Sequence, residues 1–331
     1  MIRSRYTLTL LFLSLIFFLV FAWNLFTGEY SFSWSDLLHD SSMAQMIFFK
    51  FRLPKALAAI AVGTALSLSG LLMQTLFKNP IAGPYILGIS SGASLGVAIF
   101  TMGAGFFASS IFFYFSQVLG ALLGSLFMML LLLFLLQYLK NIITLLIVGV
   151  MLSALAASLI SILQYFSSDY LLKSFVIWTM GSLSQVSYTN LTIMGLAISL
   201  AILLYVVNIK NINILILGTE EIKNYGVHKR KLQWTILIIT SILTSVVTAF
   251  CGPIGFIGII VPHFAKMLTK TSDHLYLIPI SILLGSILML FSDIITQIPP
   301  NGMILPINSV TAILGIPFIL WILLKSAKNN F

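Results

Sequence analysis

LFMMLLLLFLLQYL, at residues 126–139, carries no charged side chain, and stretches of this kind decide the fold. Soluble domains carry roughly a quarter charged residues. Here only 8% of the 331 residues are charged and 60% are hydrophobic. Apolar runs of about 20 residues, the length that a helix needs to cross the hydrocarbon of a bilayer, recur from end to end. The composition therefore predicts a polytopic membrane protein.

Apolar segments bounded by charge, proline or polar clusters predict about ten transmembrane helices. Lipid permits only helices or closed barrels, and these runs lack the strict alternation of a barrel strand. The expected fold class is therefore all-α, with residues 1–331 as a single transmembrane domain. The first run is too long for a secretory signal and is expected to be retained. The segments are residues 6–27, 53–76, 86–106, 111–139, 141–166, 190–208, 232–250, 253–269, 275–295 and 306–324.

The basic residues predict that both termini lie in the cytoplasm. With ten crossings in this orientation, 13 of the 17 Lys and Arg face inward, as the positive-inside rule requires. The net charge of +9 is therefore explained by membrane topology, and no nucleic acid partner is expected. The basic residues that would face outward are Lys50, Arg52, Lys55 and Lys173.

Charge is concentrated in one predicted cytoplasmic loop, at about residues 215–234. Its centre reads GTEEIKNYGVHKRK at residues 218–231, and its spacing suits short helices outside the membrane. One interpretation is a solvated loop that anchors the topology. The other is a docking surface for a cytosolic partner. Composition alone leaves both open.

Ionisable side chains are scarce in the middle of the apolar segments. Asp293 lies near the outer end of the ninth segment, and His263 in the eighth is interpreted as a hydrogen-bonded structural residue. Ion-coupled carriers usually place such groups at membrane depth, so the pattern argues against a secondary transporter. Cys251 is the only cysteine, and no His or carboxylate pair has a suitable spacing. We therefore expect no metal site, no catalytic residues and no enzymatic activity.

Glycine and proline predict tight packing and turns. AVGTALSLSG (residues 61–70), LGISSGASLG (87–96) and GPIGFIG (252–258) are rich in small residues, which let helix backbones approach closely. KNPIAGP (78–84) predicts a stiff cytoplasmic turn built on Asn79, Pro80 and Pro84. No G-x-x-x-x-G-K-[S/T] motif occurs, so the chain has no P-loop for ATP.

In their order and intervals, these motifs resemble the permease subunits of FecCD-type ABC importers, which carry iron chelates and vitamin B12. Residues 51–96 are similar to the family signature from RLPR through NPLA to the later LG and GA. WTMGSL (178–183), GPIGFIGIIVPHFAK (252–266) and TAILGIPFILWILLK (311–325) also fit. The resemblance covers nearly the whole chain.

The resemblance implies a set of partners in the bacterial cytoplasmic (inner) membrane. Two permeases, identical or paralogous, would pair in the membrane lipid around a central pathway. Two cytosolic ATPase subunits would use the ATP, so this chain would bind no cofactor, and an extracytoplasmic binding protein would deliver substrate. The family's coupling loop corresponds to the charged loop, with the ATPase contacts implied at Gly218, Thr219, Glu220, Glu221, Tyr225 and Gly226.

Family resemblance also implies a docking pair for acidic residues of the binding protein, at Arg52 and Lys55. A helix-flanking anchor is the alternative interpretation of the pair. Lys55 replaces the usual Arg and loses its bidentate geometry. Ile304 and Asn308 replace a Glu and a Gly before the last helix, and Gln297 stands where some members carry Arg. Part of the outer contact is therefore neutral.

The expected function is that of an importer permease for ferric siderophores. A cobalamin or haem importer of the same family is the alternative, and an ion-coupled carrier or a polytopic scaffold or channel would be a different class. A pathway without fixed charge suits a bulky chelate that is held weakly. Family analogy and mild polarity place its lining at Ser153, Ser158, Ser161 and Gln164.

Overall fold

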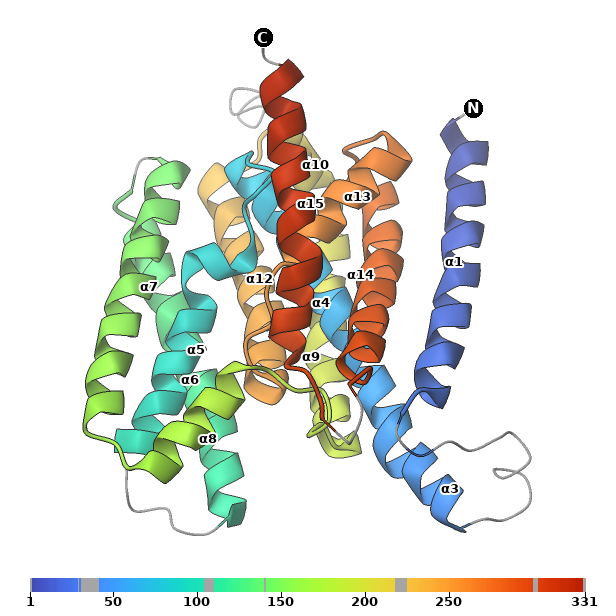
Figure 1. Cartoon of the computed structure of the whole chain (residues 1–331). Coiled ribbons are helices and arrows are strands. Elements are labelled where there is room, and N and C mark those ends of the chain that lie inside the picture. The colour runs from blue at the N-terminus through green and yellow to red at the C-terminus, as the bar shows by residue number, and fades with distance from the viewer. Residues whose placement is uncertain are drawn as a thin grey trace.

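The computed structural model describes residues 2–28, 30, 42–103, 110–139, 141–217, 225–299 and 303–329. All regular elements in these ranges are helical, which confirms the all-α fold class. Figure 1 shows one bundle in which the N and C labels lie at the same end. We call this end the terminal end and the other the distal end.

The helices follow one another with short connections. In chain order they are α1 (Ile2–Phe26), α3 (Ser42–Ile47), α4 (Leu53–Phe77), α5 (Ile89–Ala98), α6 (Ser110–Leu136), α7 (Ile142–Tyr165), α8 (Asp169–Thr179), α9 (Tyr188–Val207), α10 (Ile209–Leu217), α12 (Lys229–Cys251), α13 (Ile257–Thr269), α14 (His274–Thr296) and α15 (Ile307–Asn329). Three shorter turns are the π-helical η1 (Phe48–Arg52) and η3 (Ile99–Gly103) and the 3-10 turn η2 (Pro84–Leu87).

Within the described residues, each of the ten predicted segments overlaps a helix. Among the described residues, seven helices are long and apolar enough to cross a membrane. The other three segments match shorter apolar helices at Ile89–Gly103, Ile257–Thr269 and Ile307–Ile322. The total of ten crossings therefore stays a prediction.

Two boundaries differ from the sequence-based expectation. The helix that was expected to begin at residue 53 continues a helical stretch from Ser42 through η1, so Lys50 and Arg52 lie within a helix and not in a loop. α8 was not predicted, because its short apolar run begins with Asp169 and is interrupted by Lys173. It lies at the distal end of the bundle in Figure 1.

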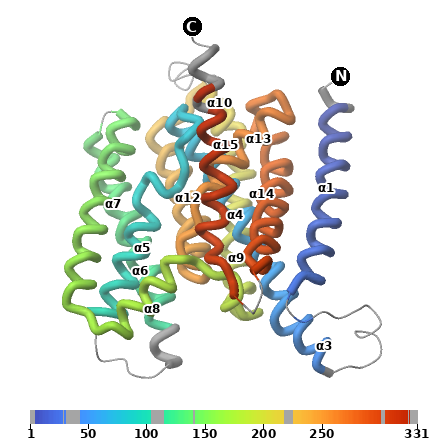
Figure 2. The backbone as a smooth tube through the Cα atoms, viewed as in Figure 1, coloured from blue at the N-terminus to red at the C-terminus, as the bar shows by residue number. Residues whose placement is uncertain are grey.

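α4 is the central helix, with most of its 25 residues buried. It contacts α14, α12 and α13 along its length. A helix that is apolar on all sides is stable only inside a bundle. In the view of Figure 2, α1 and α7 lie at opposite edges of that bundle.

Glycines allow the backbone of α4 to contact the backbones of α14 and α13 closely. A Cβ atom on Gly63 would lie 2.2 Å from the carbonyl oxygen of Gly285 in α14. A Cβ on Gly70 would lie 1.7 Å from the carbonyl oxygen of Gly258 in α13. The tight packing expected of the stretches at residues 61–70 and 252–258 is therefore confirmed.

α5 and α6 cross in the same way. A Cβ atom on Gly96 would lie 2.0 Å from the carbonyl oxygen of Gly120, and one on Gly124 would lie 2.1 Å from that of Gly92. This confirms the packing expected of residues 87–96. The two glycines of α6 that complete the crossing were not singled out by the sequence analysis.

Candidate functional site

α7 packs on one side only and leaves a long face exposed. It contacts mainly α5 and η2 through buried residues that include Leu145, Gly149 and Ala156. Ser158 and Ser161 are exposed and three residues apart, so they share a face. Among the described residues of α7 no charged side chain occurs. The exposed face is therefore mildly polar and neutral.

The serine hydroxyls of α7 are already hydrogen-bonded within the helix. Ser153, Ser158 and Ser161 each donate to the carbonyl four residues earlier, at 2.8, 3.0 and 3.0 Å. Such bonds satisfy the donor, so the hydroxyl can lie on an apolar surface. The oxygen lone pairs remain available as weak acceptors.

The four candidate pathway residues do not lie on one face. The hydroxyl of Ser153 lies 2.7 Å from the place that a Cβ atom of Gly88 would occupy, so Ser153 packs against the start of α5. Gln164 is half-buried. Of the four candidates, Ser158 and Ser161 are the exposed pair, and the pathway assignment stays a prediction.

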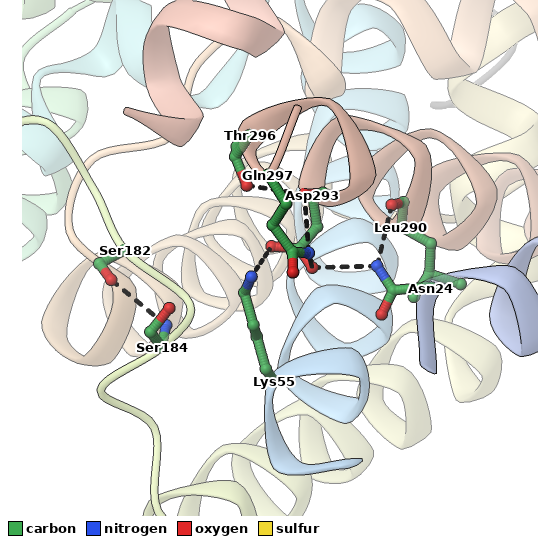
Figure 3. A network of polar contacts seen from close by, with 8 residues as sticks. All are labelled: Asn24, Lys55, Ser182, Ser184, Leu290, Asp293, Thr296 and Gln297. Carbon is green, nitrogen blue, oxygen red and sulfur yellow. Dashed lines mark hydrogen bonds and ion pairs between the residues drawn. The ribbon is translucent and has the colours of Figure 1, made fainter. Parts of the chain in front are cut away.

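Near the distal end, a buried ion pair joins α4 to α14. The ammonium of Lys55 lies 2.9 Å from Oδ1 of Asp293, and the two side chains are 14% and 2% exposed. The other carboxylate oxygen accepts bonds from Asn24 of α1 at 2.9 Å and from Gln297 at 3.1 Å. Figure 3 shows these four side chains converging. The carboxylate is thus both charge-paired and hydrogen-bonded, as burial requires.

Arg52 is also turned into the chain and is only 9% exposed. Its guanidinium donates to the carbonyl of Leu25 at 3.1 Å and to that of Tyr30. Leu25 lies in the last turn of α1, where carbonyls lack partners within the helix and a cation is favourable. Arg52 therefore holds the end of α1 against η1.

The predicted docking pair is thus engaged within the chain. Docking of a binding protein at Arg52 and Lys55 remains a prediction, and the partner's carboxylates would compete with Asp293 for Lys55. Sequence reasoning missed Asn24 and Gln297 as members of this network. The signal was present, because a carboxylate in an apolar segment needs a partner.

Part of the predicted coupling loop lies outside the described residues, including Gly218, Thr219, Glu220 and Glu221. Tyr225 is 64% exposed, and Gly226 adopts a φ of +70°, which favours glycine. Both residues line a cavity of about 470 Å³ beside the first turn of α12. The described part of this loop therefore presents an open surface.

The turn at residues 78–88 connects α4 to α5 and is not helical at its start. The side-chain oxygen of Asn79 accepts the N–H of Ile81 at 3.0 Å, and Ala82 N–H donates to the carbonyl of Asn79 at 3.1 Å. Pro84 is buried at the first position of η2. Tyr85 donates its hydroxyl to the carbonyl of Ile254, which attaches the turn to the segment before α13.

Asn308, one of the two residues near the start of the last helix that depart from the family pattern, makes hydrogen bonds to other segments. The side-chain oxygen of Asn308 accepts the N–H of Gly255 at 2.9 Å, and its own N–H donates to the carbonyl of Met180 at 3.3 Å. Asn308 therefore joins the start of α15 to the ends of two other segments. Ile304, the other departure, is 62% exposed.

Comparison with known proteins decides the family. The model of the FecCD transport family matches residues 15–325. The chain belongs to that family. The hemin transport permease HmuU of Yersinia pestis is 33% identical, over 92% of this chain and 91% of the relative. The vitamin B12 import permease BtuC of Vibrio cholerae is 32% identical, over 98% and 94%.

A solved structure supports the same conclusion. It is described as a metal-chelate type ABC transporter in an inward-facing conformation, and it has a TM-score of 0.83 to this FecCD permease at 29% identity. The match covers 97% of this chain and 99% of the other. The protein is therefore a multi-pass ABC importer permease of the cytoplasmic membrane, and this class confirms the resemblance found in the sequence.

Proposed function

We propose that this FecCD permease imports ferric siderophores. It would pair with a second permease, identical or paralogous, and work with two cytosolic ATPase subunits and an extracytoplasmic binding protein. The observation that carries the proposal is the exposed, uncharged face of α7 around Ser158 and Ser161. Relatives named for hemin and vitamin B12 transport support a bulky, metal-bearing cargo.

The proposed topology has ten crossings with both termini in the cytoplasm. Its support is the distribution of Lys and Arg along the chain and the position of both termini at one end of the bundle. The terminal end then faces the cytoplasm and the distal end faces outward. α10 and the described part of the coupling loop lie at the cytoplasmic end, where an ATPase could reach them.

α7 has the dimensions and surface of a pathway helix. Its 24 residues extend about 36 Å, enough to cross the hydrocarbon of a bilayer. Polar residues in membrane helices usually face other helices or a water-filled space and not lipid. Ala154 and Ala157 are exposed beside Ser158 and Ser161. The side chains on this face are therefore short as well as mildly polar. It leaves room for a bulky cargo between paired permeases.

Weak binding is what a pathway requires. A tight site would trap the cargo, whereas back-bonded hydroxyls offer only weak acceptors. The wide, neutral face therefore suits a chelate that is delivered by one protein and released to the other side. Directional transport then comes from partners that bind inward- and outward-open states with different affinity.

A reconstitution experiment tests the proposed function. The permease is incorporated into liposomes with its proposed partners, an ATPase and a binding protein. Uptake of radiolabelled ferric siderophore, hemin and cobalamin is measured with and without ATP. We expect ATP-dependent accumulation of the ferric siderophore above that of the other two.

Each of the other outcomes has a distinct meaning. Preferential uptake of cobalamin or hemin would show that the substrate is that cargo and not a ferric siderophore. Uptake that needs an ion gradient but no ATP would contradict the importer mechanism itself. Flux that needs neither would indicate a channel.

A further inference from the structure

A cavity of about 240 Å³ opens between the ends of α4, α10 and α13. Its lining includes Lys78, Lys266, Asn79 and Ser272. A water molecule takes about 30 Å³ of liquid volume, so the cavity holds several waters or a group of similar size. Lys78 directly follows the helix Met43–Phe77, which is long and apolar enough to cross a membrane, so we expect the cavity to lie at the depth of lipid head groups.

Lys266 supplies a half-buried positive charge to this cavity. Its ammonium donates to Oε1 of Gln74 at 3.2 Å. The amide nitrogen of Gln74 donates to the carbonyl of Ile259 at 3.0 Å, which orients Oε1 toward the lysine. Within the described part of the chain, Lys266 has this neutral amide and no carboxylate as its partner. A charge that is partly buried without an opposite charge is costly.

Among the described residues that line the cavity, none is acidic. In the described part of the chain, the acidic residue near Lys266 in sequence is Asp273, which accepts bonds from Asn213 at 2.7 Å and from the N–H of Leu275 at 2.9 Å. Asp273 therefore already serves as the N-cap of α14. The ion pair between Lys55 and Asp293 lies near the distal end, away from this cavity.

The other polar groups of the lining are hydrogen-bond donors. The side-chain oxygen of Asn79 already accepts the N–H of Ile81, so its amide group offers N–H donors. Lys78 adds an exposed ammonium, and Ser272 adds a hydroxyl. The described lining thus combines two cations with neutral donors, and it matches a group that carries negative charge and several acceptor oxygens.

We propose that this cavity binds the phosphate of an anionic phospholipid in the cytoplasmic leaflet. A cationic cavity between membrane helices at the cytoplasmic surface is the arrangement that recognises such head groups. The inference is independent of the cargo, because none of its residues belongs to the candidate pathway or docking pair.

Native mass spectrometry of the purified full-length permease tests the proposal without ATPase, binding protein or cargo. The protein is titrated with phosphatidylglycerol, with phosphatidylcholine of the same acyl chains, and with inorganic phosphate. We expect one phosphatidylglycerol to bind at least tenfold more tightly than phosphatidylcholine. Replacing Lys78→Gln or Lys266→Gln should weaken that binding about tenfold, since each removes a charge-assisted hydrogen bond.

Lys270→Gln is the matched control. Lys78 and Lys270 both end a helix in the left-handed conformation, with φ of 48° and 54°, and both are exposed, but Lys270 does not line the cavity. Lys270→Gln should leave lipid binding within about twofold. If Lys266→Gln fails to fold, the exposed Lys78 still decides the question.

Three results would overturn the proposal. Equal binding of the two lipids would exclude recognition of net negative charge. Equal effects of Lys78→Gln and Lys270→Gln would mean that the surface charge and not the cavity attracts lipid. Binding of inorganic phosphate that depends on Lys78, without binding of phosphatidylglycerol, would assign the cavity to a soluble phosphate.

Discussion

Lys55 of α4 and Asp293 of α14 form an ion pair of 2.9 Å, and Asn24 of α1 donates a second bond to the same carboxylate. Three helices that are distant in sequence therefore meet at one buried carboxylate (Figure 3). The residue that was expected to attract a partner's acidic groups already has an acidic group of its own.

Removing one partner of this ion pair should destabilise the permease strongly. We expect Lys55→Met or Asp293→Leu alone to lower the free energy of unfolding by about 3–5 kcal/mol, because each leaves a buried charge unpaired. The double variant should recover most of that loss, since an apolar pair needs no compensation. Thermal unfolding in detergent measures the effect, with the exposed Lys50→Met as control. Additive losses in the double variant would contradict the pairing.

Docking of the binding protein makes a different prediction for the same residues. If Lys55 attracts its carboxylates, Arg52→Glu with Lys55→Glu should weaken association and its dependence on salt. Asp293→Asn should instead strengthen association several-fold at low salt, because it removes the competing carboxylate. Asp169→Asn, at the exposed start of α8, is the control for a general loss of negative charge. Unchanged affinity in all variants would assign Arg52 and Lys55 to structure alone.

The glycine contacts of α4 should tolerate no side chain. Gly70→Ala would place Cβ 1.7 Å from a backbone oxygen, which cannot move without shifting α13. We expect the free energy of unfolding to fall by about 1–3 kcal/mol and the folded yield to be lower. Gly195→Ala is the matched control, because a Cβ there would have no atom within 4 Å. Fluorescence-detected size-exclusion chromatography compares the two, and equal yields would refute the close contact.

Bulk on the exposed face of α7 should block transport without unfolding the protein. We expect Ser158→Phe or Ser161→Phe to reduce the initial rate of ATP-driven uptake tenfold or more. Thr192→Phe on α9 is the control, because Thr192 is also exposed and also donates to the carbonyl four residues earlier, at 2.9 Å. An equal reduction in the control would remove the evidence that α7 lines the pathway.

Charge reversal in the coupling loop should separate the permease from its ATPase. We expect Glu220→Arg with Glu221→Arg to lower co-purification of the ATPase several-fold, because the change reverses the charge of the predicted contact surface. Membrane insertion should persist, which surface labelling of intact cells can verify. Normal co-purification together with normal uptake would show that the contact lies elsewhere.

The sequence was sufficient to predict the ten apolar helices and the glycine-rich stretches, because apolar length and small residues are local properties, but it did not predict α8. The sequence alone could not identify which pairs of helices pack against each other. Gly70 was recognisable, but its contact with Gly258 depends on how α4 and α13 cross. The helical start at Ser42 was also missed, because the charged residues Lys50 and Arg52 were interpreted as the boundary of an apolar segment.

The candidate site was predicted less completely. The exposed pair Ser158 and Ser161 follows from helical spacing, but the contact of the half-buried Ser153 with Gly88 depends on the packing of α5. Asp293 was noticed, whereas its partners come from α1, α4 and the end of α14. Long-range polar networks of this kind require the arrangement of the helices and not only their positions in the chain.

Backbone touches backbone on two sides of α4, at Gly63 and at Gly70. Sliding α4 past α13 or α14 would drive carbonyl oxygens into neighbouring α-carbons, so we expect these three helices to travel as one rigid body. α7, which leans mainly on α5 and η2, has no such interlock with them. We therefore expect the relative motion of the transport cycle to occur beside α7, while α4, α13 and α14 keep their contacts with one another.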